Sequence, residues 1–476
     1  IKCMKFDYDL IVIGAGSGGL VVASGAASLG AKVALIESEK MGGDCLNSGC
    51  VPSKSFLKGA HLAKDIDSSR LFGLDTELKG VSIEKLMGRV QEVITSIEPH
   101  DSVERYEGLG VEVILGSGEL VDIHHVKVGE KVLNTKNIVI SSGSKPYIPP
   151  IKGLDQVPYL TNRNIFNLTT QPKHLIVLGG GPIGLELGQG FRHLGSDVTI
   201  IDQNPHLFAK DDPEVGPLME EVLLQDGISL HLTTKIVEVL TNNGQINVIV
   251  EKNGLKKEIV GDYLLVSLGR SPVTEGLGLE KVGIKVNQRG YVITNNKLQT
   301  NFKNIYACGD VTGPYQFTHM AGYQAGIVIR NSIFHLGAKL DYSAVPWTTY
   351  TKPEVAHVGH TEVTARESSV FNKSILIPLG DNDRARAEND EKGFLKLIIS
   401  NKNKLIGATL VGEKAGEMIP VATLAIRQKL KASAFLGLIF SYPTEAEIFK
   451  TAALKELKDS VKPWQSKLIK SLFLRH

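Results

Sequence analysis

Residues 42–54 read GGDCLNSGCVPSK, which places Cys45 and Cys50 five positions apart in a chain with only 4 cysteines. An unbroken helix would hold the Cα atoms of such a pair roughly 8 to 9 Å apart, whereas a disulfide needs less than about 7 Å. A bridge therefore requires a broken helical turn. The intervening residues 46–49 (LNSG) tolerate one, and Pro52 is compatible with the start of a second helix.

A disulfide that closes so small a loop gains little stability from chain entropy, and strain makes it easier to reduce. These are the properties of a disulfide that opens during a reaction. Two alternatives exist for the pair. It could be two buried free cysteines, since Cys is among the most buried residue types. It could also bind zinc, although no second Cys or His pair follows at ligand spacing.

The composition narrows the class of protein. A chain of 476 residues is too long for one core, and its net charge of +2, with both signs interspersed, favours neither a nucleic-acid-binding stripe nor an acidic tail. The low cysteine count indicates a reducing compartment. No uncharged apolar run reaches about 18 residues, and no signal peptide precedes the first predicted strand. We therefore expect a cytoplasmic protein.

A strand, a glycine-rich turn, a helix and a second strand follow one another near the start of the chain. The apolar run YDLIVI leads into GAGSGG at 14–19, a helical stretch follows, and the strand KVALIE ends in Glu37. Gly14 would make the turn, Gly16 would admit a pyrophosphate at the helix N-terminus, and Gly19 would let helix and strand approach. Glu37 would accept hydrogen bonds from ribose hydroxyls.

The same arrangement recurs in the middle of the chain. The run HLIVL leads into GGGPIG at 179–184, and the strand DVTIID ends in Asp202. In both copies the acid lies 23 residues after the first glycine. One glycine motif is weak evidence, but two copies with the same downstream acid are improbable as purely structural turns, so they predict two dinucleotide sites. Together with a redox disulfide they indicate electron relay.

The remaining segments suggest where domains begin and end. SKPYIPP at 144–150 indicates an exit from the first domain, and the GRSP segment after Ser267 indicates a return. IYACGD places Asp310 at the end of a strand, where a simple turn is the alternative. From about residue 340 the segments FLKLIIS, KLIGATLVG and EMIPVATLAIRQKL predict an antiparallel sheet with helices, of the kind that forms interfaces.

Over essentially its full length the chain resembles the pyridine nucleotide-disulfide oxidoreductases, which include dihydrolipoyl dehydrogenase, glutathione reductase and mercuric reductase. The match is carried by GAGSGG, GGDCLNSGCVPSK, SSGSKPYIP, GGGPIGLELG, YACGDVTG and VPWTTYTKPEVAHVG. The resemblance implies an α/β fold with two Rossmann-like dinucleotide-binding domains, for FAD and NAD, and a C-terminal α+β dimerisation domain. The implied boundaries are 1–150 and 271–338 for FAD, 151–270 for NAD(P), 339–462 for dimerisation and 463–476 for a basic amphipathic tail.

The family also implies roles for matching residues. Cys50 would be the thiol against the flavin, and Cys45 the outer thiol that exchanges with substrate. Lys54 and Glu186 match an ion pair near the flavin, where the lysine stabilises negative charge on the reduced ring and the glutamate keeps the lysine charged. Asp310 would hold the ribityl or pyrophosphate region. The other residues assigned to FAD are Gly14, Gly16, Gly18, Gly19, Glu37, Gly43, Gly118, Ser142 and Gly143, and those assigned to NAD are Gly179, Gly181, Gly184, Asp202 and Gly269.

The second nucleotide site is expected to prefer NADH. The charge of Asp202 would repel a 2′-phosphate, and residues 203–207 offer no arginine to hold one. Lys210 leaves NADPH as the less favoured alternative. Hydride would then pass from nicotinamide to flavin and on to the disulfide, or in the reverse direction.

One departure from the family concerns proton transfer. The disulfide-exchanging members carry His-Pro-Thr-x-x-Glu, whereas this chain has Tyr442 at the His position and keeps Glu447. Holding a tyrosine as phenolate at pH 7 would cost about 4 kcal/mol, and losing general acid-base help costs about 100- to 10,000-fold in rate. Dihydrolipoyl dehydrogenase is the favoured specific activity, but its turnover is expected to be inefficient. His319, His357 and His360 lie outside the motif and are not assigned.

Other activities remain as alternatives. Mercuric reductases also lack that His and have a similar last domain, including segments like DRARAEND and GEMIPVATLAIR. They use a C-terminal cysteine pair, however, which the ending SLFLRH does not provide. A quinone- or metal-reducing relative is the main competitor, and glutathione reductase is disfavoured by the expected NADH preference. A silent FAD-binding subunit belongs to another class, and retention of Cys45, Cys50, Lys54 and Glu186 argues against it.

Two further features concern charge and assembly. Asp44 stands where relatives commonly have Thr, and its charge should raise the pKa of the Cys45 thiol unless a nearby cation offsets it.

In the family the segment from Tyr442 to Glu447 reaches the partner's disulfide, so we expect a homodimer whose sites need both chains.

The tail 463–476 puts Trp464, Leu468, Leu472 and Arg475 near one helical stripe. A basic amphipathic end of this kind could touch a membrane surface. Docking on the dimer partner is the favoured alternative.

Overall fold

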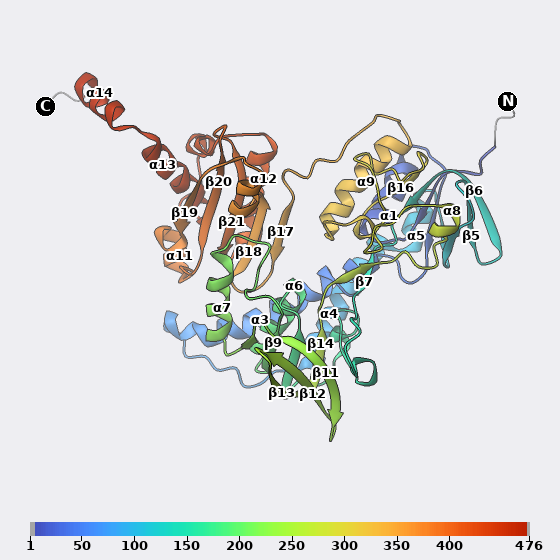
Figure 1. The fold of residues 1–476 in the computed structure, drawn as a ribbon, viewed down its shortest axis with the longest axis horizontal. Coiled ribbons are helices and arrows are strands. Elements are labelled where there is room, and N and C mark those ends of the chain that lie inside the picture. Colours follow the sequence, from blue (N-terminus) through green and yellow to red (C-terminus); the bar gives the residue numbers. More distant parts are fainter. Residues whose placement is uncertain (1–4, 474–476) are drawn as a thin grey trace. The chain divides into compact units, whose positions relative to one another are not determined.

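The computed structural model describes residues 5–473 (Figure 1). The chain divides into two compact units. The first contains the chain up to Gln203 together with Thr234–Leu340, and the second contains Asn204–Thr233 together with the chain from Asp341 onward. The domain boundaries expected from the sequence stay a prediction.

The first unit is built on a largely parallel sheet in the order β3-β2-β1-β6-β5-β4, with β16 also beside β6. Its strands are β1 (Tyr8–Ile13), β2 (Val33–Glu37), β3 (Val111–Leu115), β4 (Gly118–Leu120), β5 (His125–Val128), β6 (Lys131–Ile140) and β16 (Ile305–Ala307). Alternate residues of β1 belong to two different core clusters, with Leu10 and Val12 in one and Ile11 and Ile13 in the other. Both faces of the strand are buried, which is why YDLIVI is apolar almost throughout.

The second glycine motif lies in a parallel sheet formed by β9 (Asp197–Ile201), β8 (His174–Leu178) and β14 (Tyr263–Val266). Three antiparallel strands also belong to the first unit, namely β11 (Lys235–Asn242), β12 (Gln245–Lys252) and β13 (Leu255–Gly261). The segments expected to leave and re-enter the first domain pair with each other as β7 (Ser144–Pro146) and β15 (Arg270–Pro272).

The helices of the first unit follow the glycine turns or cover the sheets. They are α1 (Ser17–Ser28), α2 (Gly43–Asn47), α3 (Cys50–Ser68), α4 (Ile83–Ile97), α5 (Val103–Gly108), α6 (Pro182–His193), α8 (Leu279–Val282) and α9 (Thr318–Ser332). Helix α1 begins directly after GAG and α6 directly after GGG, as expected for two Rossmann-like motifs.

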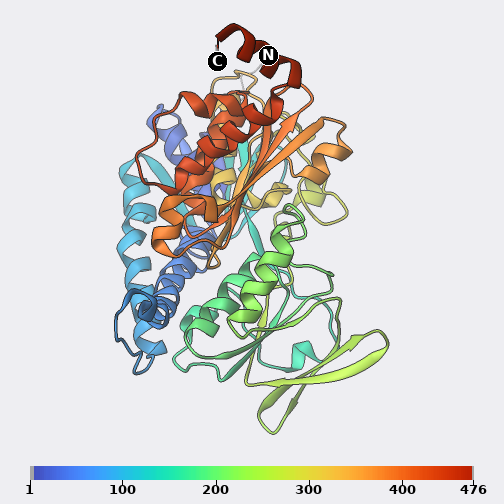
Figure 2. The same ribbon diagram turned by 90° about the vertical axis from the view of Figure 1, so that its left-hand side faces the viewer.

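The second unit contains an antiparallel sheet in the order β17-β18-β21-β20-β19 (Figure 2). Its strands are β17 (Pro346–Thr349), β18 (Glu354–Gly359), β19 (Phe371–Pro378), β20 (Phe394–Ser400) and β21 (Leu405–Gly412). Its other elements are α7 (Val215–Gln225), β10 (Ser229–His231), α10 (Glu362–Glu367), α11 (Asp383–Glu388), α12 (Ala415–Arg427), α13 (Ile448–Ser460) and α14 (Pro463–Phe473). The apolar faces of α12 and α13 pack into one core with this sheet, which confirms the predicted sheet-and-helix layer.

Candidate active site

The two glycine turns have the same backbone φ at their first glycine and make matching close contacts. Gly14 and Gly179 both have a φ of +103°, which L side chains rarely adopt. A Cβ on Gly14 would lie 2.4 Å from the carbonyl oxygen of Ser141, and a Cβ on Gly179 would lie 2.5 Å from that of Ser267. Each turn is therefore pressed against the end of the next parallel strand. The sequence repeat is a repeat of three-dimensional structure.

The acids that end the second strands also make matching contacts. Glu37 accepts a hydrogen bond from the backbone N–H of Ala15 at 2.6 Å, and Asp202 accepts one from that of Gly180 at 2.6 Å. The carboxylates thus brace the glycine turns beside the place where a ribose would lie. The ribose contact expected of Glu37 and the repulsion of a 2′-phosphate expected of Asp202 stay predictions.

The start of each of these helices is open to an anion. The N-cap residues Gly16 and Gly181 provide no capping side chain, so the first amides of α1 and α6 can donate to a ligand. A Cβ on Gly16 would meet nothing closer than Gly43 at 4.0 Å, and one on Gly181 would meet nothing within 4 Å. These observations show that the two turns fit two dinucleotide pyrophosphates.

The cysteine pair lies at the predicted break between two helices. Helix α2 ends at Asn47, and α3 begins at Cys50. Between them Gly49 adopts φ −120° and ψ −113°, and a Cβ on it would lie only 2.8 Å from the carbonyl oxygen of Asp44. Gly49 therefore lets the chain turn back so closely that Cys50 contacts Cys45. Both side chains are free thiols in this structure.

The two thiols have opposite proton affinities. The pKa of Cys50 is lowered to about 6, mainly by the hydrogen bond from Cys45. The hydroxyl of Thr318 and the charge of Lys54 also lower this pKa, whereas burial raises it. The bond to Cys50 raises the pKa of Cys45, and so does burial. At neutral pH the pair is therefore a Cys50 thiolate that accepts a hydrogen bond from the Cys45 thiol. A third cysteine, Cys308, is fully buried, and burial raises its pKa to about 12.

Lys54 and Glu186 meet as the sequence suggested. Their Nζ and Oε2 atoms are 2.8 Å apart, and the pair joins α3 to α6. Lys54 is four residues after Cys50 and so shares its side of α3. Glu186 is buried, with 5% of its surface exposed, and a buried carboxylate needs a cation as partner.

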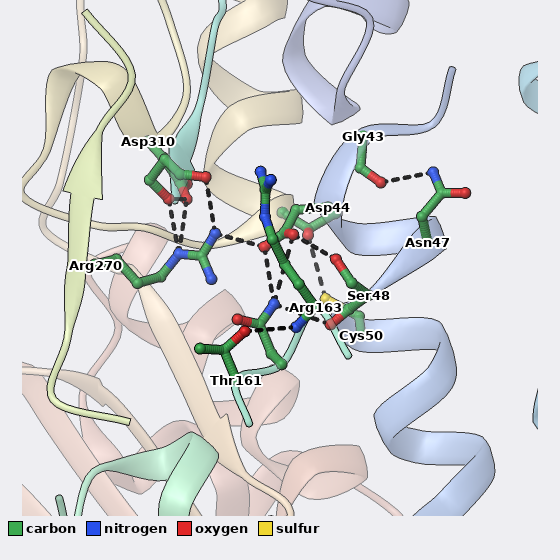
Figure 3. A network of polar contacts seen from close by, with 12 residues as sticks. Gly43, Asp44, Asn47, Ser48, Cys50, Thr161, Arg163, Arg270 and Asp310 are labelled. Atoms are coloured by element: carbon green, nitrogen blue, oxygen red, sulfur yellow. Dashed lines mark hydrogen bonds and ion pairs between the residues drawn. The ribbon is translucent and has the colours of Figure 1, made fainter. Parts of the chain in front are cut away.

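A cation lies next to Asp44, where a nearby positive charge was the condition for offsetting the effect of this carboxylate on Cys45. Its carboxylate is paired with Arg270 from β15, and Ser48 and Asn162 also donate to it (Figure 3). The guanidinium of Arg270 therefore lies directly against the charge of Asp44.

Arg270 continues the network to the Gly-Asp segment. Its Nε donates to the hydroxyl of Ser144 at 2.7 Å and lies 3.8 Å from the carboxylate of Asp310, to which Ser144 donates at 2.5 Å. Burial raises the pKa of Asp310, while Ser144 and Arg270 oppose the rise. The cysteine segment and Asp310 are therefore joined through one arginine (Figure 3).

Tyr442 and Glu447 lie in the second unit. The Tyr442 hydroxyl donates to the carboxylate of Asp383 at 3.1 Å, at the start of α11. That hydrogen bond and the charge of Asp383 raise the pKa of Tyr442 above its usual value, and Glu447 adds to the rise. The side chain is 72% exposed. At neutral pH it is a phenol, so it cannot act as a base.

The sequence model of the pyridine nucleotide-disulphide oxidoreductases matches residues 8–325, and that of the family's dimerisation domain matches residues 345–453. The chain belongs to this family. Pyridine nucleotide-disulphide oxidoreductases of this kind use FAD and a nicotinamide nucleotide, and so does this protein. The dimerisation domain supports a homodimer.

Several known proteins are similar to this oxidoreductase over most of their length. Mercuric reductase of Staphylococcus aureus is 35% identical over 454 residues, which are 95% of this chain and 83% of the relative. Dihydrolipoyl dehydrogenase of Chlamydia trachomatis is 34% identical over 461 residues, which are 95% and 97% of the two chains. The Cu(II) complex of the HOCl-induced flavoprotein disulfide reductase RclA from Escherichia coli superposes with a TM-score of 0.84, 29% identity and coverage of 95% and 100%.

The other sequence-assigned residues of the oxidoreductase occupy the glycine turns or the strand ends next to them. A Cβ on Gly43 would meet Gly16 at 2.7 Å, and the Ser142 hydroxyl donates to the carbonyl of Val273 at 2.6 Å. Gly118 packs on the side chain of Ile36. Those that belong to the two turns or the following segments are Gly18, Gly19, Gly143, Gly184 and Gly269.

Some residues of the site were missed from the sequence. Thr318, the first residue of α9, places its hydroxyl 3.4 Å from the Cys50 sulfur, and no spacing rule links two residues 268 positions apart.

The histidine His357, which was not assigned a role, does not belong to the site. Its ring nitrogens contact Thr409 and the Gly359 carbonyl, and burial lowers its pKa, so His357 is a neutral structural residue. In the described part of the chain, no helix is long and apolar enough to cross a membrane.

Proposed function

We propose that this oxidoreductase passes electrons from NADH through FAD to the Cys45–Cys50 pair and from there to a small disulfide, with a dihydrolipoyl dehydrogenase-like reaction as the specific form. The observation that supports it is the asymmetric thiol pair, in which Cys50 is a thiolate and Cys45 a thiol. When bound, FAD accepts a hydride from NADH and exchanges an electron pair with a disulfide.

The residues that would hold the nucleotides are those of the two matching turns. We assign the pyrophosphate of FAD to the N-terminus of α1, with Glu37 at the ribose and Asp310 near the ribityl chain. The second turn would hold NADH in the same way, with Asp202 at the ribose. Lys54, which forms an ion pair with Glu186, would stabilise negative charge beside the cysteine pair.

The thiol chemistry balances as follows. The Cys45–Cys50 disulfide takes up two electrons and one proton and becomes the Cys45 thiol and the Cys50 thiolate. After losing its proton, Cys45 attacks one sulfur of the substrate disulfide and releases the other sulfur as a thiol. The Cys50 thiolate then attacks Cys45, restores the bridge and releases the second sulfur as a thiolate, which takes a proton from water. The step that needs help is deprotonation of Cys45.

Tyr442 favours a second candidate acceptor. In a family dimer this residue would approach the partner's Cys45, and a phenol hydrogen-bonded to Asp383 cannot take the thiol proton. A thiophilic metal ion replaces the proton on binding sulfur and needs no such base. One relative is named a mercuric reductase, and one similar structure is described as a Cu(II) complex. We therefore include Hg(II) and Cu(II) as candidate acceptors.

Anaerobic titration with NADH tests the proposed electron path. The holoenzyme should develop a long-wavelength absorbance from the Cys50 thiolate next to the flavin, and Cys50→Ser should lose it. If no such band forms, the protein is an FAD carrier, and if Cys50→Ser keeps the band, the electrons do not pass through Cys50.

Parallel assays of NADH oxidation with lipoamide and with Hg(II) or Cu(II) distinguish the acceptors. Tyr442→His should raise the rate of lipoamide reduction about 100-fold or more and leave metal-dependent NADH oxidation unchanged. Tyr442→Phe is the matched control for the loss of the phenol. Equal lipoamide rates in the wild type and Tyr442→His would contradict the argument about the missing base.

A further inference from the structure

Helix α14 presents large apolar side chains to solvent. Trp464 is 60% exposed, Leu468 48%, Leu472 61% and Phe473 76%. The first three recur every fourth residue, so they lie along one side of the helix. The preceding helix α13 buries Ile448, Phe449, Ala452 and Ala453 fully, although its Leu454 and Leu457 are 41% and 47% exposed. An exposed apolar stripe of this kind marks a contact surface.

The same helix is basic. Lys467 and Lys470 lie on the side of α14 away from Leu468 and Leu472, and Lys462 directly precedes the helix. The helix sequence PWQSKLIKSLF contains no acidic residue. A helix with an apolar stripe, an aromatic residue near one end and long lysine side chains on the other side suits the boundary between water and an anionic bilayer. Arg475, which the sequence placed on the stripe, lies outside the described residues.

We propose that α14 docks the protein on an anionic lipid surface. Trp464, Leu468 and Leu472 enter the headgroup boundary, and Lys467 and Lys470 reach the lipid phosphates. The attachment is peripheral, because an 11-residue helix is too short to span a bilayer.

A second copy of this chain fits the helix less well than lipid does. The family's dimerisation domain ends at residue 453, before α14 begins. A stable interface buries about 800 Å² on each partner with few charges at its centre, whereas α14 combines a narrow stripe with lysines and no acid. A like-charged copy of the same helix would repel it. We therefore favour lipid over the partner docking that the sequence analysis preferred.

Flotation of the holoenzyme with lipid vesicles tests the proposal. The protein should float with vesicles of phosphatidylcholine and phosphatidylglycerol at low salt, but not with phosphatidylcholine alone, and about 0.5 M NaCl should release it. Leu468→Ser/Leu472→Ser and Lys467→Glu/Lys470→Glu should each lower partitioning at least about ten-fold.

Matched controls come from the exposed strand β13. Leu255→Ser and Lys256→Glu/Lys257→Glu change the same residue types at exposed positions of the first unit and should float like the wild type. Flavin content and NADH oxidation show that each variant is folded. The proposal is wrong if the wild type does not float, if the α14 variants float equally well, or if light scattering shows that they have become monomers.

Discussion

The Cys50 thiolate depends on contacts from three separate parts of the chain. Cys45, the Thr318 hydroxyl and the Lys54 ammonium all lower its pKa, to about 6, against the effect of burial. Thr318 is the one donor that can be removed without changing a thiol or the ion pair. Thr318→Val should therefore shift the thiolate titration upward, while Thr318→Ser, which keeps the hydroxyl, should restore it.

Ultraviolet thiolate absorbance of the reduced protein against pH provides the measurement. The wild type should show its first thiol transition near pH 6, and Thr318→Val should show it at higher pH. Identical curves for the wild type and Thr318→Val would mean that the 3.4 Å contact between the hydroxyl and the sulfur does not act on the thiolate.

Asp44 shows how a distant partner changes the effect of a charge. Because Arg270 pairs with it, Asp44→Thr should leave the alkylation rate of the cysteines nearly unchanged, whereas removal of an unpaired carboxylate would increase that rate. The same substitution removes the carboxylate that Arg270 contacts most closely and leaves it only the more distant Asp310, at 3.8 Å, so it should cost about 1 to 3 kcal/mol of stability.

A double-mutant cycle of Asp44→Thr with Arg270→Gln, followed by urea unfolding, should give a coupling energy of about 1 kcal/mol or more. Additive effects would show that the ion pair contributes nothing, and faster alkylation of Asp44→Thr would show that the offset by Arg270 is incomplete.

The elements around the cysteines followed from local sequence, since LNSG contains residues that end a helix and the break appears where it was expected. The strands after which both glycine motifs begin were also evident, because buried parallel strands are apolar throughout. The strands β11 to β13 were not anticipated, although their turns carry the signal. Asn243-Gly244 and Asn253-Gly254 both have positive φ at each residue, as tight hairpins require.

Other contacts could not have been inferred from one sequence. The Arg270 to Asp44 pair joins residues 226 positions apart, and nothing in the spacing of two charged residues so far apart identifies them as partners. The same holds for Thr318. What the sequence specified well was each local element and its motif, and what it left open was which side chains from different elements meet.

The break between α2 and α3 makes its own prediction. In Gly49→Ala the new Cβ would lie 2.8 Å from the carbonyl of Asp44, so the two helices must separate and the sulfurs with them. We expect the Cys45–Cys50 disulfide to become easier to reduce, by about 1 kcal/mol or more, in a redox titration against dithiothreitol.

Gly88→Ala in α4 is the control for that substitution, because a Cβ there meets nothing within 4 Å, and it should leave the redox midpoint unchanged while raising stability by up to about 1 kcal/mol. Equal midpoints for Gly49→Ala and the wild type would mean that the tight turn does not set the geometry of the pair.

Over the whole chain, the arrangement of strand, glycine turn and helix occurs twice. In addition, a segment far in sequence from the C-terminal sheet belongs to the same unit as that sheet. The residues 204–233 follow the second glycine motif directly, yet they belong to the unit that contains the C-terminal sheet. A buried lysine connects the two parts. Lys396 of β20 is 1% exposed and contacts Asp212 at 3.3 Å, Glu214 at 2.8 Å and Glu362 at 3.0 Å.

Replacing Lys396 should therefore destabilise the second unit strongly. Lys396→Met keeps the length of the side chain but leaves the buried carboxylate of Asp212 without its cation, which costs about 3 to 5 kcal/mol. Trp347 donates to Asp211 in the same unit, so its fluorescence during urea unfolding reports on this unit. Lys455→Met removes an exposed pair with Asp459 and should cost about 0.5 kcal/mol or less.

The difference in unfolding free energy between the wild type and Lys396→Met should depend on pH, because Lys396 and its acidic partners titrate. Burial alone would lower the pKa of Lys396, but Glu214, Asp212 and Glu362 raise it above its usual value, so its contribution is complete below about pH 10 and is lost as the pH rises further. Although burial would raise it, Arg366 and Lys396 lower the pKa of Glu362 to about 2, so its contribution is present above about pH 4.5 and disappears as the pH falls toward 2. The difference between the wild type and Lys396→Met should thus be largest between about pH 5 and 10. A difference that persists undiminished at pH 2, or none at pH 7, would show that the cluster does not hold residues 204–233 to the sheet.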